Sequence, residues 1–282
     1  MIKIENTKVT GWDVAITGMR NPKNSWKHSD TKYIKSHLCT SDYEVALAEV
    51  CGGTAPLIGP NDLKLMMTLV KAGTDHRKFM RFIKVTVDIT APLYWWKEFD
   101  TYKVGTIANS CSTMHKIAEK EFSLEDFSCE HLNEDSIEVL RRIVDELEAN
   151  RKMFLVLDGD EAKHHWLQMI QLLPSSYNQR RTVELNYEVL ANMYRKTSRR
   201  YHKLDEWNVN HSESLCHWIT RLPYSELITY TPTHISEVLH ELSELASSVS
   251  YRYTNEQGIE SLPVIQIADL SDIIEKLRKK YM

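Results

Sequence analysis

The segment AGTDHRKFMRFIKVTVDITAPLYWWKEFDTYKVGTIANSCSTMHK, residues 72–116, contains the clearest structural pattern in the chain. Within it, apolar residues alternate with polar ones over residues 82–89, and this period of two predicts a half-buried β-strand. A short amphipathic helix is expected from about 91 to 100, because Pro92 suits a first helical turn. The segment ends in amide, hydroxyl, thiol and imidazole side chains that a hydrophobic core does not need, so it is a candidate binding site.

Apolar residues at helical spacing predict that much of the remaining chain is helical. Asn61 or Asp62 stands near the start of one expected helix, and Asn133 is expected to cap another. The expected elements are a strand over 2–10 and helices over 12–20, 42–50, 61–72, 134–154, 161–172, 182–200, 212–220 and 233–247, after Ser112 and from Ser271. The predicted fold class is therefore α+β: helix-rich, with a small mixed or antiparallel sheet flanked by helices.

The composition predicts one globular body without covalent cross-links. With 282 residues, 42% of them hydrophobic, the chain can bury a large core, so residues 1–282 are expected to form a single domain. A net charge of −4 argues against a nucleic-acid polymer as partner. The five cysteines are odd in number and form no CxxC pair, which favours a reducing cytoplasm over a disulfide framework or a metal site. Neither a signal peptide nor a membrane span is expected.

Two segments, 102–115 and 173–207, mix hydroxyls, amides and cations more densely than the expected helices require. Such side chains suit phosphate groups and the edges of pyrimidine bases, because Arg donates in a fork and Ser and Asn supply further hydrogen bonds. A solvated, hydrogen-bonded surface explains the same composition. Composition alone leaves both interpretations open.

The first of these segments resembles a block of the flavin-dependent thymidylate synthases. His76, Lys78 and Phe79 precede the strand, and the next helix leads into TYKVGTIANSCS, residues 101–112. The family has a His-x-Ser-Pro-Phe-type turn, a strand, a Gln-bearing helix and the signature Arg-His-Arg-x-x-Ser-x-Asn-Glu-x-Ser-x-Arg. Thr106 stands for the first Ser of that signature. If one residue is inserted, Asn109 stands for its Asn and Ser112 for its last Ser.

The second segment resembles the family's other block. That block reads Leu-Pro, then Thr and Asn-Leu-Arg, then Leu-Arg and His-Ala-Gln-x-Glu. Here Leu173-Pro174 is followed by Thr182 and Asn186, by a basic cluster at 195–200, and by residues 202–206, which begin with His and end with Glu. The two blocks together place a core similar to this family over residues 60–220 and leave 221–282 as a C-terminal helical extension.

Several positions depart from the family pattern. Thr101-Tyr102-Lys103 replaces Arg-His-Arg, and the Gln of the preceding helix falls near Glu98. Ser110 replaces the Glu of the signature, and Glu188 replaces an Arg in the second block. The chain therefore resembles a divergent relative in which cations have been exchanged.

The resemblance implies a homotetramer whose sites are shared between subunits. It implies an FAD site with eight contact residues, His76, Lys78, Tyr102, Lys103, Thr106, Asn109, Asn186 and His202. It implies a dUMP site with five contact residues, Glu98, Ser110, Ser112, Arg195 and Arg199. The implied reaction is reductive methylation of dUMP to dTMP, with methylenetetrahydrofolate and NADPH as cosubstrates and no protein nucleophile.

Three alternatives remain open at the level of sequence. A related pyrimidine nucleotide-modifying enzyme, such as a hydroxymethyltransferase, fits the same substrate. A nucleotide-binding or interaction protein that has lost catalysis is favoured by the missing Arg-His-Arg. Cys111, flanked by polar residues and followed by His115, has the surroundings of a nucleophile, but free cysteines more often pack as small apolar residues.

Overall fold

The computed structural model describes residues 2–195 and 199–230, which belong to one compact unit, Met1–Tyr230. The helices expected over 233–247 and from Ser271 lie outside the described residues. The organisation into one domain with a C-terminal helical extension stays a prediction.

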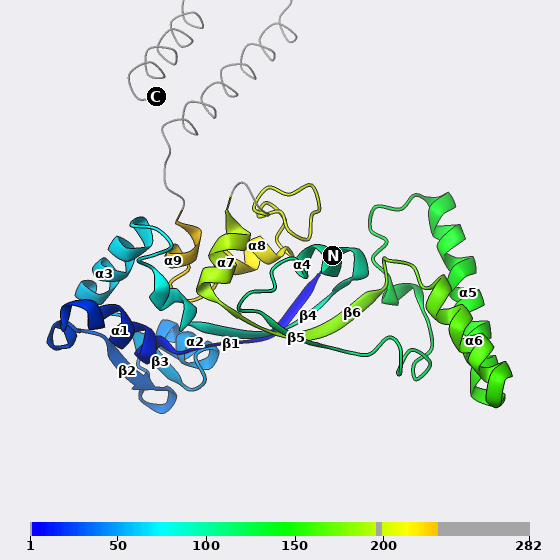
Figure 1. Cartoon of the computed structure of the whole chain (residues 1–282), viewed down its shortest axis with the longest axis horizontal. Helices are drawn as coiled ribbons and strands as arrows, with labels where there is room; N and C mark the ends of the chain where they lie inside the picture. Colours follow the sequence, from blue (N-terminus) through cyan, green and yellow to red (C-terminus); the bar gives the residue numbers. More distant parts are fainter. Residues whose placement is uncertain (1, 196–198, 231–282) are drawn as a thin grey trace, which may run out of the picture. The chain divides into compact units, whose positions relative to one another are not determined.

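Four antiparallel strands form the main sheet, in the order β1-β4-β6-β5 (Figure 1). They are β1 (Lys3–Thr10), β4 (Lys84–Pro92), β5 (Ile107–Ser110) and β6 (Asn178–Asn186). The strands expected over 2–10 and 82–89 are confirmed as β1 and β4. In β4 the odd-numbered residues from Val85 onward are buried and the even-numbered ones up to Thr90 are partly exposed, so one face of the sheet packs into the core and the other is polar.

One hydrophobic core joins the apolar face of the sheet to the helices that follow β4 and β6. These helices are α4 (Leu93–Phe99), α7 (Tyr187–Tyr194), α8 (Leu215–Thr220) and α9 (Glu226–Thr229). Trp95 and Trp96 are both buried, and Trp95 stacks on Phe99 and Trp207 with ring centroids 5.2 and 4.8 Å apart. The helix expected from 91 to 100 is thus α4, and its aromatic residues anchor it to the core.

The N-terminal part of the unit adds three helices and a second, two-stranded sheet, drawn in blue and cyan in Figure 1. Its helices and strands are α1 (Trp12–Arg20), β2 (Lys32–Lys35), α2 (Asp42–Val50), β3 (Thr54–Leu57) and α3 (Pro60–Lys71). The helices expected over 12–20, 42–50 and 61–72 are confirmed. Short 3₁₀ helices cover Asn21–Lys23, Trp26–His28, Ser36–Leu38, Lys78–Arg81 and Leu124–Asp126.

Two long helices, α5 (Glu134–Val156) and α6 (Gly159–Leu172), pack against each other and share a smaller hydrophobic cluster with residues from 117–127. Asn133 caps α5 as expected, because its side-chain oxygen accepts a hydrogen bond from the Ser136 amide at 2.9 Å. Both helices confirm the apolar spacing seen in the sequence.

Two expected helices are wrong. Residues 182–200 were expected to be one helix, but β6 runs to Asn186, and among the described residues of this range only α7 is helical. The buried Val183 and Leu185 alternate with exposed Thr182 and half-buried Glu184, and this strand pattern is masked by the helical spacing of the apolar residues just after it. No helix follows Ser112 either: residues 113–115 form a turn, in which the Ser112 hydroxyl accepts from the His115 amide at 3.0 Å.

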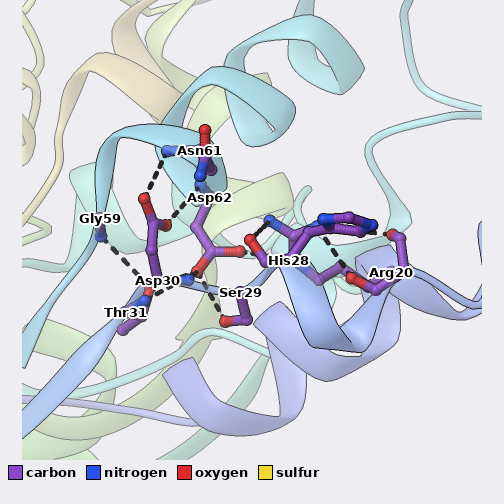
Figure 2. Close-up of polar contacts among 9 residues, drawn as sticks. Arg20, His28, Ser29, Asp30, Thr31, Gly59, Asn61 and Asp62 are labelled. Carbon is purple, nitrogen blue, oxygen red and sulfur yellow. Dashed lines mark hydrogen bonds and ion pairs between the residues drawn. The ribbon is translucent and has the colours of Figure 1, made fainter.

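A buried carboxylate, Asp62, holds the N-terminal part together (Figure 2). Its Oδ1 accepts from Arg20 Nε at 2.7 Å, and its Oδ2 accepts from the hydroxyls of Ser29 and Thr31 at 2.7 Å and from the amides of Asp30 and Thr31 at 3.0 Å. Burial opposes ionisation of Asp62, but the hydrogen bonds from Thr31, Ser29 and Arg20 outweigh it, so its pKa lies below the usual value. The carboxylate is therefore charged and fully hydrogen-bonded.

The cap of α3 comes from a distant segment and not from Asn61 or Asp62. The carboxylate of Asp30 accepts from the amides of Asn61 at 2.9 Å and Asp62 at 3.1 Å (Figure 2). A Cβ on Gly59 would lie 2.2 Å from Asp30 Cγ, so only glycine allows this approach. The loop before β2 is thus tied to both α1 and α3.

Candidate functional site

Four of the residues expected to contact nucleotide or flavin come together beside the C-terminal end of α4. Arg199 forms an ion pair with Glu98, with Nη2 and Oε2 2.7 Å apart, and its guanidinium lies 5.7 Å from the centroid of the Tyr102 ring. His202 is the fourth member: its backbone amide donates to Arg199 O at 3.0 Å, and burial followed by the charge of Arg199 lowers the pKa of its ring. Their proximity in space was not visible from the chain order alone.

The same corner holds two arginines against aromatic rings. Arg199 also lies 5.2 Å from the ring centroid of Trp207, and Arg200 lies between the rings of Tyr194 and Tyr201 at 5.1 and 4.9 Å. The Nε atoms of both arginines are buried and have no hydrogen-bond partner within the described part of the chain. Guanidinium groups held on aromatic faces with unused donors form a site suited to an anion.

A second group surrounds Asn186, at the junction of β6 and α7. The side-chain oxygen of Asn186 caps α7 by accepting from the Val189 amide at 3.0 Å, and its Nδ2 donates to Gly105 O at 3.4 Å. Gly105 has a φ of 77°, and a Cβ there would lie 2.8 Å from Asn186 Nδ2. The adjacent Thr106 hydroxyl is buried without a hydrogen-bond partner among the described residues. A ligand hydroxyl or phosphate would satisfy it.

A buried ion pair that sequence reasoning missed lies next to this group. Arg77 Nη2 donates to Glu188 Oε1 at 3.0 Å, and Arg77 Nε lies 2.8 Å from Oε2 without the alignment of a hydrogen bond. Arg195 faces the pair: burial and the charge of Arg77 lower its pKa, and Glu188 opposes that effect. Glu188 stands where the resembling family has an Arg, so the sequence shows the reversed charge at this position. The sequence does not show that Arg77, far away along the chain, is its partner.

Most of the other predicted residues are exposed. Asn109 and Ser110 are exposed on β5, the edge strand of the sheet, opposite Thr182 and Arg181 of β6. Three further predicted residues are exposed: His76, Lys78 and Lys103. The Ser112 hydroxyl is engaged in a hydrogen bond within the turn that follows it. Cys111, the candidate nucleophile, is exposed as well. Their roles stay predictions.

Three cavities of the unit are lined by other residues. The largest, about 440 Å³, lies between the 114–118 loop and the start of α6, where Trp166 Nε1 donates to Met114 O at 2.8 Å. Among the described residues, no cluster of His, Cys, Asp and Glu could hold a metal ion, and no helix is long and apolar enough to cross a bilayer. The predicted site residues line none of these three cavities.

The comparisons with known proteins find structural relatives only. No protein-family model and no curated protein sequence matches the chain. The crystal structure of thymidylate synthase X from Helicobacter pylori with FAD and dUMP matches with a TM-score of 0.51 at 15% identity, covering 83% of this chain and 100% of that one.

Two further solved structures match with lower scores. A flavin-dependent thymidylate synthase from Helicobacter pylori complexed with FAD and dUMP gives a TM-score of 0.48 at 14% identity, covering 81% of this chain and 97% of that one. The UMP/dUMP methylase PolB from Streptomyces cacaoi bound with 5-Br dUMP gives 0.46 at 12% identity, covering 81% and 93%. The chain therefore has a helix-rich α+β fold similar to that of thymidylate synthase X.

Proposed function

We propose that this protein modifies a pyrimidine nucleotide, and specifically that it methylates dUMP to dTMP using FAD, methylenetetrahydrofolate and NADPH. The observation that carries the proposal is the pair Arg199 and Arg200, whose guanidinium groups lie on aromatic rings while their Nε atoms remain unpartnered within the described residues. The fold supports it, since the matching structure with FAD and dUMP is covered over its whole length.

The residues present fit a phosphate-bearing cofactor. Two buried guanidinium Nε atoms and the Thr106 hydroxyl are donors without partners in the described part of the chain, and a phosphate offers the acceptors that they lack. Arg199, Arg200 and Thr106 would therefore hold FAD or dUMP phosphates, with Tyr102 beside them. Bound FAD would supply the hydride transfer that reductive methylation requires.

His202 is prepared for a neutral, donating role. Its lowered pKa favours the uncharged ring at neutral pH. Nδ1 accepts a hydrogen bond from the Leu204 amide at 3.1 Å, which leaves the proton on Nε2. Nε2–H can then donate to a carbonyl oxygen of the uracil or of the flavin. Glu98 has a positioning role, because its ion pair fixes the guanidinium of Arg199.

The alternative of a nucleotide-binding protein without catalysis has one specific observation in its favour. Glu188 stands at a position where the resembling family has a cation, and it forms a buried ion pair with Arg77. That cation of the family is therefore missing here. Thr101 and Tyr102 likewise replace an Arg and a His of the signature, while Lys103 keeps a positive charge in place of the second Arg. On this alternative the protein binds dUMP at the same cluster but transfers no one-carbon group. A hydroxymethyltransferase would also bind dUMP there, but it would transfer a hydroxymethyl group in place of a methyl group.

The proposal is tested by flavin content, binding and activity. The full-length protein should be yellow when purified or after addition of FAD, and should bind dUMP and convert it to dTMP. Arg199→Ala should lower dUMP or FAD affinity at least tenfold, since a charge-assisted hydrogen bond contributes about 1.5–3 kcal/mol. Arg142→Ala, at an exposed α5 position paired with Glu138, is the matched control.

Each outcome separates the candidates. A colourless protein that binds neither FAD nor dUMP overturns the proposal. Binding of dUMP without any product supports the non-catalytic alternative, and a hydroxymethylated product supports the other. Growth of a thymidine-requiring strain that expresses the protein would confirm synthesis of dTMP in cells. Light scattering of the same preparation tests the proposed homotetramer, and cell fractionation tests the proposed cytoplasmic location.

A further inference from the structure

A cavity of about 390 Å³ lies where β1 ends, α1 begins and the β2–β3 sheet folds over them. Its walls come from Val9 to Asp13, from Tyr33 of β2, and from the end of α2 and the start of β3. None of these residues belongs to the proposed FAD and dUMP site. A volume in this range is typical of small-molecule sites.

One wall residue, Trp12, holds its indole N–H against a weak acceptor. Trp12 is 3% exposed, and its Nε1 is buried without a hydrogen-bond partner among the described residues. Its ring is fixed by edge-on contacts with Tyr187 and Tyr224, at centroid distances of 5.4 and 5.3 Å. The indole N–H approaches the thiol of Cys51, which lines the same cavity and is a weak acceptor.

The cavity also has one charged wall residue, the carboxylate of Asp13 in the first turn of α1. Its field is felt by the neighbouring phenol: burial, and next the charge of Asp13, raise the pKa of Tyr33 to about 12. No Lys, Arg or His is among the lining residues, so a phosphate group would meet a negative wall and no cation. A ligand that lacks a phosphate and donates hydrogen bonds to Asp13 is favoured.

These features together define a ligand class. Trp12 and Tyr33 contribute aromatic side chains to the lining, and Thr10 and Thr54 add hydroxyl groups. We propose that the cavity binds an uncharged nucleoside with an amino-substituted base, such as adenosine. Asp13 accepts from the exocyclic amino group, the base lies beside the side chains of Trp12 and Tyr33, and the two threonines reach ribose hydroxyls.

Adenosine and inosine provide a matched pair of probes, because inosine has a carbonyl in place of the amino group and a protonated ring nitrogen next to it. Titration calorimetry on the full chain should show saturable adenosine binding at one site, with inosine at least tenfold weaker. In the NMR spectrum, the indole N–H signal that Trp12→Phe removes should shift with adenosine. Equal binding of the two nucleosides, or no binding of adenosine, overturns the proposal.

Two variants locate the site. Asp13→Asn should weaken adenosine binding about tenfold or more, as expected for loss of a hydrogen bond to a charged group. Asp42→Asn, an exposed first-turn acid of α2 that does not line the cavity, should leave it unchanged. Arg199→Ala should also leave it unchanged, which separates this cavity from the proposed FAD site. Adenosine binding that is lost in Arg199→Ala and kept in Asp13→Asn overturns the proposal and leaves the proposed function untouched.

Discussion

Two buried arginine–carboxylate pairs in this unit differ in how completely their atoms are hydrogen-bonded. In the Arg20–Asp62 pair, the carboxylate accepts five hydrogen bonds from Arg20, Ser29, Asp30 and Thr31. In the Arg77–Glu188 pair, one aligned hydrogen bond joins the partners, while Arg77 Nε and Glu188 Oε2 have none within the described residues. Both pairs are at most 7% exposed at their side chains.

The difference separates a structural charge from one near a proposed binding site. Desolvation of a buried carboxylate is offset only when its lone pairs are filled, as they are at Asp62. Arg195 is close enough to feel both charges of the Arg77–Glu188 pair: burial first, and then the charge of Arg77, lower its pKa, and Glu188 opposes that effect. The first pair therefore stabilises the fold, and the second is expected to change its environment when an anion binds.

The largest expected effect is the loss of stability in Asp62→Asn. Asparagine keeps the shape of the side chain but replaces one carboxylate oxygen with an NH₂ group. Whichever oxygen is replaced, the NH₂ group then faces at least one buried N–H or O–H donor that had bonded to that oxygen. The unfolding free energy should fall by about 3–5 kcal/mol, the range for breaking a buried charged network. Urea denaturation measures it, with the exposed first-turn Asp42→Asn as control. A loss below about 1 kcal/mol would contradict the structural role given to this pair.

Of the two buried pairs, the Arg77–Glu188 pair is expected to show the smaller loss of unfolding free energy, measured in Glu188→Gln. Glutamine keeps an oxygen for Arg77 Nη2, and fewer hydrogen bonds are lost than at Asp62, so the unfolding free energy should fall by about 1–3 kcal/mol. Removing the carboxylate also leaves Arg77 and Arg195 without their counter-charge. If the neighbouring site binds dUMP, affinity should rise, and titration calorimetry would detect it. A stability loss as large as that of Asp62→Asn would remove the distinction between the pairs.

How much of this comparison the sequence could predict depends on how far apart the partners are along the chain. Alternation over 82–89 and the Asn133 cap are local patterns, and both are confirmed. The cap of α3 by Asp30 and the Arg77–Glu188 pair join residues about 30 and more than 100 positions apart, which no local period encodes. For the candidate site, the resemblance selected Glu98, Tyr102, Thr106, Arg199 and His202. It did not select Arg200, and the buried donors of Arg200 and Thr106 that lack partners among the described residues are visible only in the structure.

The smallest expected effect comes from a third charged network, which is complete but lies on the polar face of the sheet. Asp88 of β4 accepts from Asn6 Nδ2 at 2.8 Å, Thr182 Oγ1 at 2.5 Å and Arg180 Nη2 at 2.8 Å. These hydrogen bonds, from Asn6 first and then Thr182 and Arg180, lower the pKa of Asp88 to about 2. This network tests whether the number of hydrogen bonds made by a carboxylate or its burial decides how much the charge contributes to the unfolding free energy.

If burial decides, Asp88→Asn should cost less than about 1 kcal/mol, because solvent screens the interactions of charges near the surface. Because the folded pKa is depressed, the contribution of Asp88 is present above the unfolded pKa of about 3.9 and is lost as pH falls toward about 2. The stability difference between wild type and Asp88→Asn, measured by urea denaturation from pH 7 downward, should therefore vanish in that window. Glu5→Gln, opposite Asp88 on the same face and paired with Lys3, is the control. A loss at Asp88 equal to that at Asp62 would mean that a filled hydrogen-bond shell stabilises a charge regardless of its exposure, and the contrast between the two buried pairs would then rest on completeness alone.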